Sequence, residues 1–299
     1  MSKNMRKISD CQLRSYSSAF SRNVFSDIAN FSDFSHLDWL ISHYGDKLKN
    51  GASYMDYLAY IYSIMTRDYR NEYIFKNEII NQLLIKKYGT RNTIAFNEFK
   101  VGDSIVDFAM MNGESKAFEI KTTFDSPKRL EKQMKDYKRI FNKRYIVVDA
   151  DECSYYRERI EDTTGIVALC IDGYKITMEE YRPAANNEEI DAKCIMKCLH
   201  TIEYKNIIVS YFGYLPKVNS FEMYDECENL LMQIPSVELN KLFINEVKKR
   251  QSVTPVLKSF PKEIRQIMLA LNLSTAKQEV LLSNLNKQIN KERPCIIRI

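Results

Sequence analysis

The sequence has few of the residues that interrupt regular structure, with eight glycines and seven prolines among 299 residues. Because these residues break helices and strands most strongly, their scarcity predicts long regular elements and little loop. No apolar run approaches the roughly 20 residues needed to cross a bilayer, and no apolar segment follows the charged first residues as a secretory signal requires. We therefore expect a protein that is neither secreted nor inserted in a membrane.

The number and spacing of the cysteines and histidines do not suit disulfide bonds or a metal site. The seven cysteines are odd in number and scattered, which is unlike a disulfide framework and indicates a reducing cytoplasm. Cys194, Cys198 and His200 lack a fourth neighbour, so they do not form the four-ligand set of a structural zinc site. The three histidines are too few for a histidine–metal nuclease, and no P-loop motif is present.

The overall composition is that of an ordinary globular protein, with 45% apolar and 28% charged residues. The length permits one large domain or two smaller ones. A net charge of +5 is mild, but residues 116–144 contain ten basic and four acidic residues, a local excess larger than that of the whole chain. Such a segment suits an anionic partner, although a solvated helix face is the simpler alternative.

The periodicity of apolar residues changes along the chain. Residues 1–69 show a helical pattern, and residues 70–88 form a stronger helix that ends at Gly89. Three strands are expected next, then a helix that begins at Ser126-Pro127, and then a buried strand. We therefore expect an N-terminal helical region (1–69), an α/β core of order αβββαβ (70–183) and a C-terminal helical region (184–299). The strands are expected at residues 93–101, 105–111, 115–121, 144–148 and 165–171, with a break in the last region near residues 251–261.

The second and third expected strands carry charged residues among apolar ones, in IVDFAMM and SKAFEIK. Successive side chains of a strand point to opposite faces, so Glu119 and Lys121 share one face of the third strand. Asp107 alternates in the same way with the apolar residues of the second strand. Because charged groups are seldom buried unless they are paired or bind a metal, these residues are candidates for chemistry.

The length of the loop between the two strands decides whether these charges meet. A two-residue Asn-Gly turn pairs Asp107 with Phe118 and leaves Glu119 on the other face. A three-residue loop that includes Glu114, with Gly113 at positive φ, pairs Asp107 with Glu119 instead. We predict the three-residue loop, or an equivalent bulge, because only that register brings the charged groups together.

Two adjacent carboxylates raise each other's pKa unless a cation keeps them ionised. Hard oxygen ligands suit Mg²⁺ or Mn²⁺, and a neighbouring lysine can orient a water or neutralise charge on phosphorus. Asp107, Glu119 and Lys121 are therefore the components of a site for metal-assisted phosphodiester hydrolysis. The alternative is a half-exposed hairpin that carries a surface Glu–Lys pair of little energetic value.

The pattern IVDF followed by EIK resembles the core motif of the PD-(D/E)XK nuclease superfamily, over roughly residues 70–148. The resemblance implies a restriction-endonuclease-like αβββαβ core with a mixed sheet. It implies that Asp107 and Glu119 are metal ligands and that Lys121 is the catalytic lysine. Glu78, in the helix before the first strand, matches the further glutamate that members often add to the metal site.

The helix after the third strand carries a second similarity. Gln133 and Tyr137 match the Q-x-x-x-Y motif of the RecB-like branch and lie on one helix face. In that branch the pair helps to position nucleic acid or the active site, and the longer string resembles a largely uncharacterised bacterial subfamily. Lys128, Arg129 and Lys132 are candidates for contact with phosphates.

We therefore expect a Mg²⁺- or Mn²⁺-dependent nuclease, a DNA endonuclease in a phage-defence or mobile-element setting. One alternative is a catalytically silent nucleic-acid-binding or protein-interaction module on the same fold, and another is an RNase toxin. The expected partner is nucleic acid, DNA rather than RNA, with no membrane. The helical regions are the expected surfaces for a homodimer or a partner protein.

Overall fold

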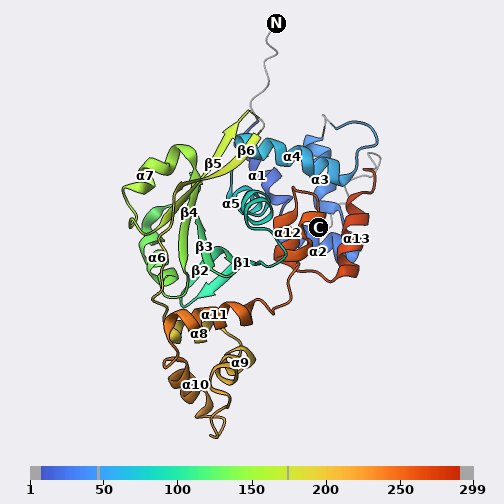
Figure 1. Ribbon diagram of the computed structural model, residues 1–299. Helices are drawn as coiled ribbons and strands as arrows, with labels where there is room; N and C mark the ends of the chain where they lie inside the picture. The colour runs from blue at the N-terminus through green and yellow to red at the C-terminus, as the bar shows by residue number, and fades with distance from the viewer. Residues whose placement is uncertain (1–7, 46–47, 174, 290–299) are drawn as a thin grey trace. The chain divides into compact units, whose positions relative to one another are not determined.

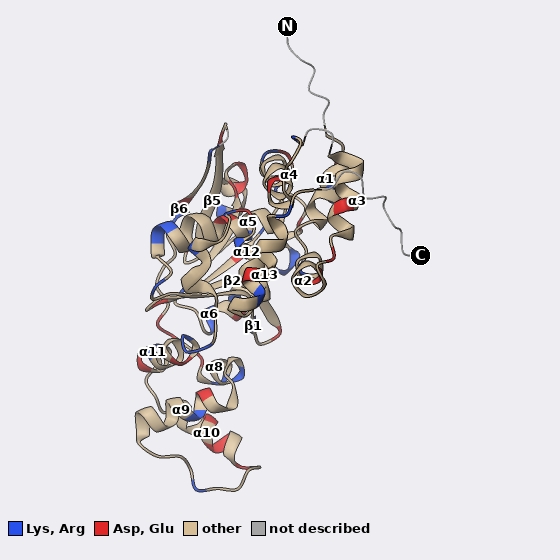
Figure 2. Ribbon diagram, turned by 90° about the vertical axis from the view of Figure 1, so that its right-hand side faces the viewer, with Lys and Arg blue, Asp and Glu red and all other residues tan. Residues whose placement is uncertain are grey.

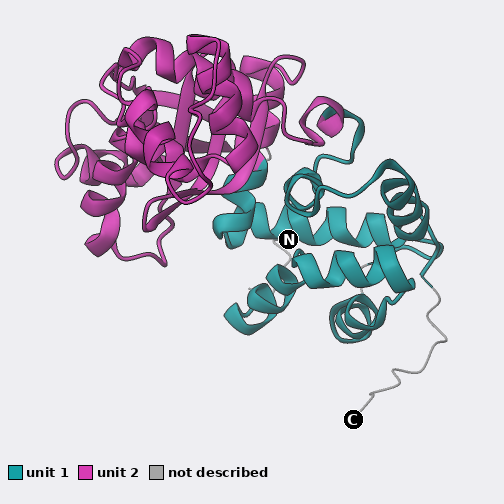
Figure 3. Cartoon of the chain, turned by 90° about the horizontal axis from the view of Figure 1, so that it is seen from below, with its two compact units in different colours: residues 1–77, 258–299 teal, residues 78–257 magenta. Residues whose placement is uncertain are grey.

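The computed structural model describes residues 8–45, 48–173 and 175–289. The chain divides into two compact units, one formed by residues 1–77 with 258–299 and the other by residues 78–257 (Figure 3). This division differs from the boundaries expected at 69/70 and 183/184. Those boundaries separate the helical segments of the sequence from the segment that contains the strands. The helices after residue 184 group with the sheet as far as residue 257, and the remaining ones group with the N-terminal helices.

The second unit is a mixed α/β structure built on a six-stranded sheet (Figure 1). The strands follow the order of the chain across the sheet. The pairs β1·β2, β2·β3 and β5·β6 are antiparallel, whereas β3·β4 and β4·β5 are parallel. The strands are β1 (Ile94–Val101), β2 (Ser104–Met111), β3 (Ser115–Ile120), β4 (Lys143–Asp149), β5 (Gly165–Asp172) and β6 (Lys175–Arg182).

Strand β3 lies between β2 and β4, and every one of its residues is buried. Helix α6 (Leu130–Lys138) packs against one face of the sheet and places Leu130, Met134 and Tyr137 in the core. The short helix η2 (Pro127–Arg129) precedes it, and the Ser126 hydroxyl caps η2 as the sequence predicts. Helices η3 (Ala150–Glu152) and α7 (Cys153–Arg157) follow β4 near the same face (Figure 1).

The opposite face carries a row of aromatic rings from β2, β3 and β4. The ring centroids of Phe108 and Phe118 lie 6.4 Å apart, and Phe118 stacks on Tyr145 at 5.2 Å.

The expected helix over residues 70–88 is present, but it changes type at its middle. Helix α5 (Glu72–Glu78) continues as the π-helix η1 (Ile79–Tyr88), which ends before Gly89 with φ of +78°.

Four helices of the second unit lie together at one end of the sheet (Figure 1). Helix α8 contacts β1, and α10 and α11 pack on α8 and α9. These contacts explain why residues 184–257 group with the sheet rather than forming a separate region. The helices are α8 (Ala192–Cys198), α9 (Thr201–Phe212), α10 (Met223–Leu231) and α11 (Ser236–Val247), followed by η4 (Thr254–Ser259).

The first unit is helical in the residues that the structure describes. Helices α1, α2 and α4 begin after serine caps, and Ser53 forms a capping box with Asp56. Helix α13 packs on α2, where the Asn284 side-chain amide donates to the Ile28 carbonyl at 2.9 Å. The helices are α1 (Asp10–Ser18), α2 (Arg22–Phe31), α3 (Ser35–Tyr44), α4 (Tyr54–Asp68), α5 up to residue 77, α12 (Arg265–Leu271) and α13 (Thr275–Leu285).

The expected strands and helices of the middle of the chain are confirmed within a few residues, apart from two differences. Strand β6 was not expected, because most of its residues are exposed or half-buried and give no clear apolar alternation. Part of the helix before β1 is a π-helix, a type that a 3.6-residue periodicity does not predict. No helix among the described residues combines the length and apolarity needed to cross a membrane.

Candidate active site

The hairpin of β2 and β3 has the predicted register. Met111 pairs with Ser115 and Phe108 with Phe118, so the loop holds three residues and Gly113 has φ of +103°. Continuing this register places Asp107 opposite Glu119, on the face that packs against α6. The three-residue loop is therefore confirmed, and the two carboxylates share one face of the sheet.

The backbone ladder between β2 and β3 ends at the pair Phe108–Phe118. Beyond it, the backbone N–H of Ile120 donates to Oδ2 of Asp107 at 2.8 Å. The aspartate side chain thus replaces the backbone acceptor that a continued ladder would supply. Meanwhile the N–H of Lys121 donates to the Val147 carbonyl of β4 at 3.0 Å, so the chain after β3 stays with β4. The candidate site lies where β2 and β3 separate.

Glu119 is the centre of the polar contacts at this separation. Its Oε1 accepts from Nζ of Lys121 at 2.8 Å and from Nε2 of Gln133 at 2.6 Å. Its Oε2 lies 2.6 Å from the hydroxyl of Tyr137. Lys121 also donates to Oε1 of Gln133 at 3.3 Å. The expected residues Glu119, Lys121, Gln133 and Tyr137 therefore form one connected network.

Three members of the network are buried, and Gln133 is half-buried. Glu119 is 2% exposed and Lys121 is 8% exposed, so their ion pair is a buried one. Burial raises the pKa of Tyr137 far above its usual range, and the negative charges of Glu119 and Asp107 raise it further. The hydroxyl of Tyr137 therefore keeps its proton and remains a donor. The hydroxyl also lies 2.8 Å from the Ile105 carbonyl, so its single proton can be shared between the two acceptors.

Glu78 ends helix α5 and is buried, and it accepts hydrogen bonds from the helix turn that follows it. Its two carboxylate oxygens accept from the side-chain amides of Asn81 and Gln82, each at 3.0 Å. In the ranges that the structure describes, no three His, Cys, Asp or Glu side chains gather as a metal-binding group. Asp107 and Glu119 are the two carboxylates that the continued β2·β3 register places opposite one another.

Of the basic residues expected to contact phosphates, Lys128 and Arg129 lie in η2 and Lys132 lies in α6, and all three are exposed. The side chains of Lys128, Arg129 and Lys132 make no ion pair or hydrogen bond with any residue that the structure describes. The acids nearby are engaged elsewhere, since Glu131 pairs with Lys135 at 2.7 Å and Asp136 accepts from Ser104. The cations are thus left unneutralised.

The match to known proteins covers this whole region. A family model described as "Bacteriophage P4 protein cII" matches residues 65–289. The chain belongs to the phage P4 protein cII family. Protein cII of Enterobacteria phage P4 is 25% identical over 189 residues, which is 59% of this chain and 60% of that protein. The chain thus spans about three fifths of the length of the curated relative that it matches.

One solved structure was also found to be similar to this member of the protein cII family. It is a protein of unknown function from Silicibacter pomeroyi, with 14% sequence identity and a TM-score of 0.31. The match covers 48% of this chain and 94% of that one. The segment matched to the protein cII family contains every residue of the candidate site, from Glu78 to Tyr137.

Three residues of this cII-family chain that the sequence does not single out adjoin the site residues along the chain or in the strand register. Glu98 of β1 has φ of +66°, rare for a residue other than glycine, and the β1·β2 register places it level with Asp107. Ile105 and Phe124 are 55% and 62% exposed. A strand periodicity does not signal a positive φ, but an unburied Phe beside Ser-Pro and basic residues could have been noticed from the sequence.

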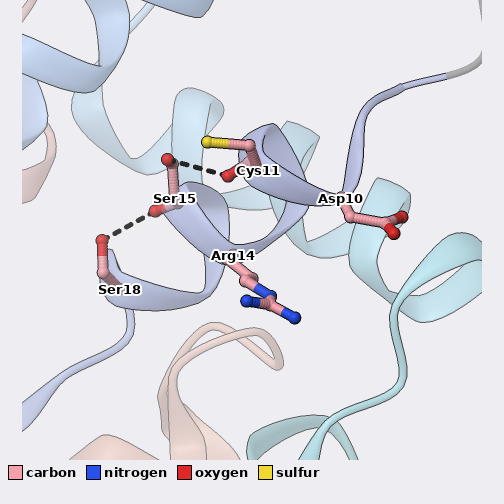
Figure 4. Close-up of a pocket in the computed structure, with 5 residues that line it drawn as sticks. All are labelled: Asp10, Cys11, Arg14, Ser15 and Ser18. Carbon is pink, nitrogen blue, oxygen red and sulfur yellow. Dashed lines mark hydrogen bonds between the residues drawn. The ribbon is translucent and has the colours of Figure 1, made fainter.

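A separate hollow of about 530 Å³ lies against helix α1 of the first unit (Figure 4). Asp10, Cys11, Arg14, Ser15 and Ser18 line it. The hydroxyls of Ser15 and Ser18 donate to carbonyls of the same helix, at 3.0 and 2.7 Å. The hollow therefore contains one exposed thiol and one guanidinium, without the acid–base pairing of the network around Glu119.

Proposed function

We propose that this protein is a metal-dependent nuclease with a PD-(D/E)XK-type site. The observation that carries the proposal is the convergence of Asp107, Glu119 and Lys121 at the separation of β2 and β3. Two residues of α6, Gln133 and Tyr137, hold the glutamate by hydrogen bonds. A buried carboxylate with an ammonium group and two oriented donors is an arrangement typical of a reactive site.

The residues suit Mg²⁺ or Mn²⁺ as the cofactor. Mg²⁺ typically takes one or two protein carboxylates and completes its shell with water and phosphate oxygens. Asp107 and Glu119 supply two carboxylates on one face of the sheet. Three donors approach Glu119, and a carboxylate has about four lone-pair sites, so it keeps one for an ion.

Each protein group has a role in this proposal. A bound metal ion would polarise a phosphoryl oxygen and lower the pKa of a water molecule. Lys121 would donate to a phosphate oxygen and neutralise the charge that develops there, because Glu119 and Gln133 fix its ammonium group. Tyr137 and Gln133 would keep Glu119 in one orientation.

The finer details of the proposal rest on the same site. The αβββαβ order before β5 supports a restriction-endonuclease-like core, and the unneutralised cations of α6 support a nucleic-acid substrate. We propose DNA as this substrate and endonucleolytic cleavage as the reaction. The phage source of the matched relative supports a role in a mobile element or in phage defence.

A second candidate is a silent nucleic-acid-binding module on this fold. It is favoured by the hydrogen bonds that already occupy both oxygens of Glu119. In that case the network would stabilise the hairpin, and the basic residues would bind nucleic acid without cleaving it. An RNase is the remaining alternative, and the choice of substrate in the experiment below separates it from a DNase.

The test is a cleavage assay on duplex DNA, single-stranded DNA and RNA, with Mg²⁺, with Mn²⁺ and with a chelator. Lys121→Ala and Glu119→Gln should reduce cleavage roughly 10²-fold or more. Glu131→Gln is the matched control, because the Glu131 side chain is 83% exposed and pairs with Lys135, outside the Glu119 network. Cleavage that survives both substitutions or ignores the chelator would contradict the proposal. Metal-independent binding without cleavage would support the silent module.

A further inference from the structure

The turn after the candidate catalytic lysine is closed on itself. Oδ2 of Asp125 accepts from the backbone N–H of Thr122 at 2.9 Å and from its hydroxyl at 2.7 Å. The N–H of Phe124 donates to the Thr122 hydroxyl at 3.2 Å, and the N–H of Asp125 donates to the Thr122 carbonyl at 3.0 Å. Thr122 itself is buried, so the turn is anchored at its start.

This anchored turn presents an aromatic side chain to solvent. Phe124, three residues after Lys121, is 62% exposed. On β2, Ile105 is 55% exposed, and its carbonyl lies beside the Tyr137 hydroxyl of the network. Single exposed apolar residues are normal on protein surfaces. Here, however, one of them follows Lys121 by three residues, and the carbonyl of the other contacts Tyr137.

The charges around Phe124 distinguish it from the other exposed phenylalanines. Every residue from 123 to 129 is exposed, and the unneutralised cations Lys128, Arg129 and Lys132 follow within eight residues. Phe221 is more exposed, at 92%, but the helix after it begins with Asp225 and Glu226, and acidic residues predominate there (Figure 2). Phe31 is 76% exposed, but it lies between Asp27 and Asp33, with no lysine or arginine from residue 23 to residue 46. Among the exposed phenylalanines of the described residues, Phe124 is thus the one whose neighbouring chain offers a cluster of cations to a polyanion.

We infer that Phe124 is a stacking platform for an unpaired base beside the proposed active site, so that the preferred ligand is single-stranded or locally unpaired nucleic acid. Proteins that bind single strands combine cations along the backbone with aromatic side chains under the bases. In an intact duplex the base faces are covered by neighbouring bases, so Phe124 has no face to contact. This inference rests on the proposed function for the position of the scissile phosphate, but the stacking can be measured without cleavage.

The test uses a tryptophan at position 124 as the reporter. The chain has a single tryptophan, Trp39 in α3, so Phe124→Trp in a Trp39→Phe background is the only indole. Single-stranded DNA, single-stranded RNA and the blunt-ended DNA duplex of one sequence are titrated in the presence of a chelator. Anisotropy of the labelled nucleic acid reports binding, and quenching of the indole reports stacking.

We expect the single strand to quench the indole strongly and the duplex to quench it little. Phe124→Ala in the otherwise unchanged protein should weaken single-strand binding roughly 5- to 100-fold. Phe221→Ala should not weaken it, and Phe221→Trp in the Trp39→Phe background should not be quenched. The DNA and RNA arms identify which strand the platform accepts.

Each remaining outcome decides one of the two claims. Binding without quenching, equal affinity for the duplex, or no binding to any of the nucleic acids would overturn the stacking inference. Quenching by single strands in a protein that never cleaves with Mg²⁺ or Mn²⁺ would support the inference and reject the nuclease. Cleavage by Phe124→Ala with unchanged affinity for single strands would reject the inference and leave the nuclease standing.

Discussion

The hydroxyl of Tyr137 lies 2.6 Å from Oε2 of Glu119, a residue 18 positions earlier in the chain. This contact joins helix α6 to strand β3 inside the core, where both residues are almost fully buried. Hydrogen bonds to charged groups contribute more to stability than neutral ones, about 1.5–3 kcal/mol. The contact therefore both fixes the candidate carboxylate and stabilises the second unit.

Replacing Tyr137 with Phe should make stability less sensitive to alkaline pH. The raised pKa of Tyr137 means that the folded protein keeps a proton that the unfolded chain loses near pH 10. This stabilisation is complete below that pH and is lost as the pH rises above it. At a pH one unit above the pKa of tyrosine in the unfolded chain, the unsubstituted protein should have lost about 1.4 kcal/mol more of its free energy of unfolding than Tyr137→Phe. Urea unfolding at pH 8 and pH 11 measures the difference, and equal losses in the two proteins would contradict the prediction.

The ion pair between Glu119 and Lys121 should behave as a buried pair. Glu119→Ala leaves the Lys121 ammonium group without its carboxylate and should lower the free energy of unfolding by about 3–5 kcal/mol. Lys121→Met combined with Glu119→Gln removes both charges and should restore at least half of that loss. Glu131→Ala, which breaks an exposed pair with Lys135, should cost less than about 1 kcal/mol. Additive effects of the two buried substitutions, measured by urea unfolding, would argue against the coupling.

The hairpin loop should depend on the conformation of Gly113. Its φ of +103° lies in a region that residues with a Cβ rarely adopt, although nothing occupies the space around that position. Gly113→Ala should therefore destabilise the second unit by about 1–2 kcal/mol through the backbone alone. Gly165→Ala tests a steric clash instead of backbone strain, because the added Cβ would lie 2.4 Å from the Tyr145 ring. Unchanged thermal unfolding of Gly113→Ala would show that the loop can adopt another conformation.

Arg144 of β4 should be replaceable by an apolar residue of similar size. Its side chain is buried, and Nε and Nη1 have no hydrogen-bond partner among the described residues. Burial also lowers the pKa of this guanidinium, which shows the cost of its desolvation. Arg144→Met should leave stability unchanged or raise it by about 1–2 kcal/mol.

Arg182 is the matched control for this substitution. Its guanidinium donates to the carbonyls of Thr164 and Glu161, so Arg182→Met removes satisfied hydrogen bonds and should destabilise the protein. Thermal unfolding of the two variants gives the comparison. A loss in Arg144→Met as large as that in Arg182→Met would mean that the buried guanidinium is satisfied in solution.

The hairpin is the part of the site that the sequence predicts best. Alternation fixes which residues share a face, and only a three-residue loop brings the faces of Asp107 and Glu119 together. The helix start at Ser126 and the apolar positions of α6 are likewise local signals. Helical spacing places Gln133 and Tyr137 on one face of α6. It does not predict that both contact Glu119, because that depends on how α6 packs against the sheet.

Other features depend on contacts between distant residues. The separation of β2 and β3 requires Asp107 to cap the Ile120 N–H, which no residue pattern indicates. The edge strand β6 lacks a buried face, and helices α8–α11 group with the sheet through packing on β1. Propensity and periodicity describe neighbours along the chain, so these arrangements had to be observed.

The composition of the first unit from two separate segments also sets an order of events during synthesis. Helix α2 buries Val24, Phe25 and Ile28, yet α12 and α13, which pack on it, are made only after the whole of residues 78–257. At ribosomal rates of about 5–20 residues per second, the apolar face of α2 waits roughly 10–50 s for its partners. The contiguous sheet unit can therefore fold first, while the N-terminal helices emerge early and are completed last.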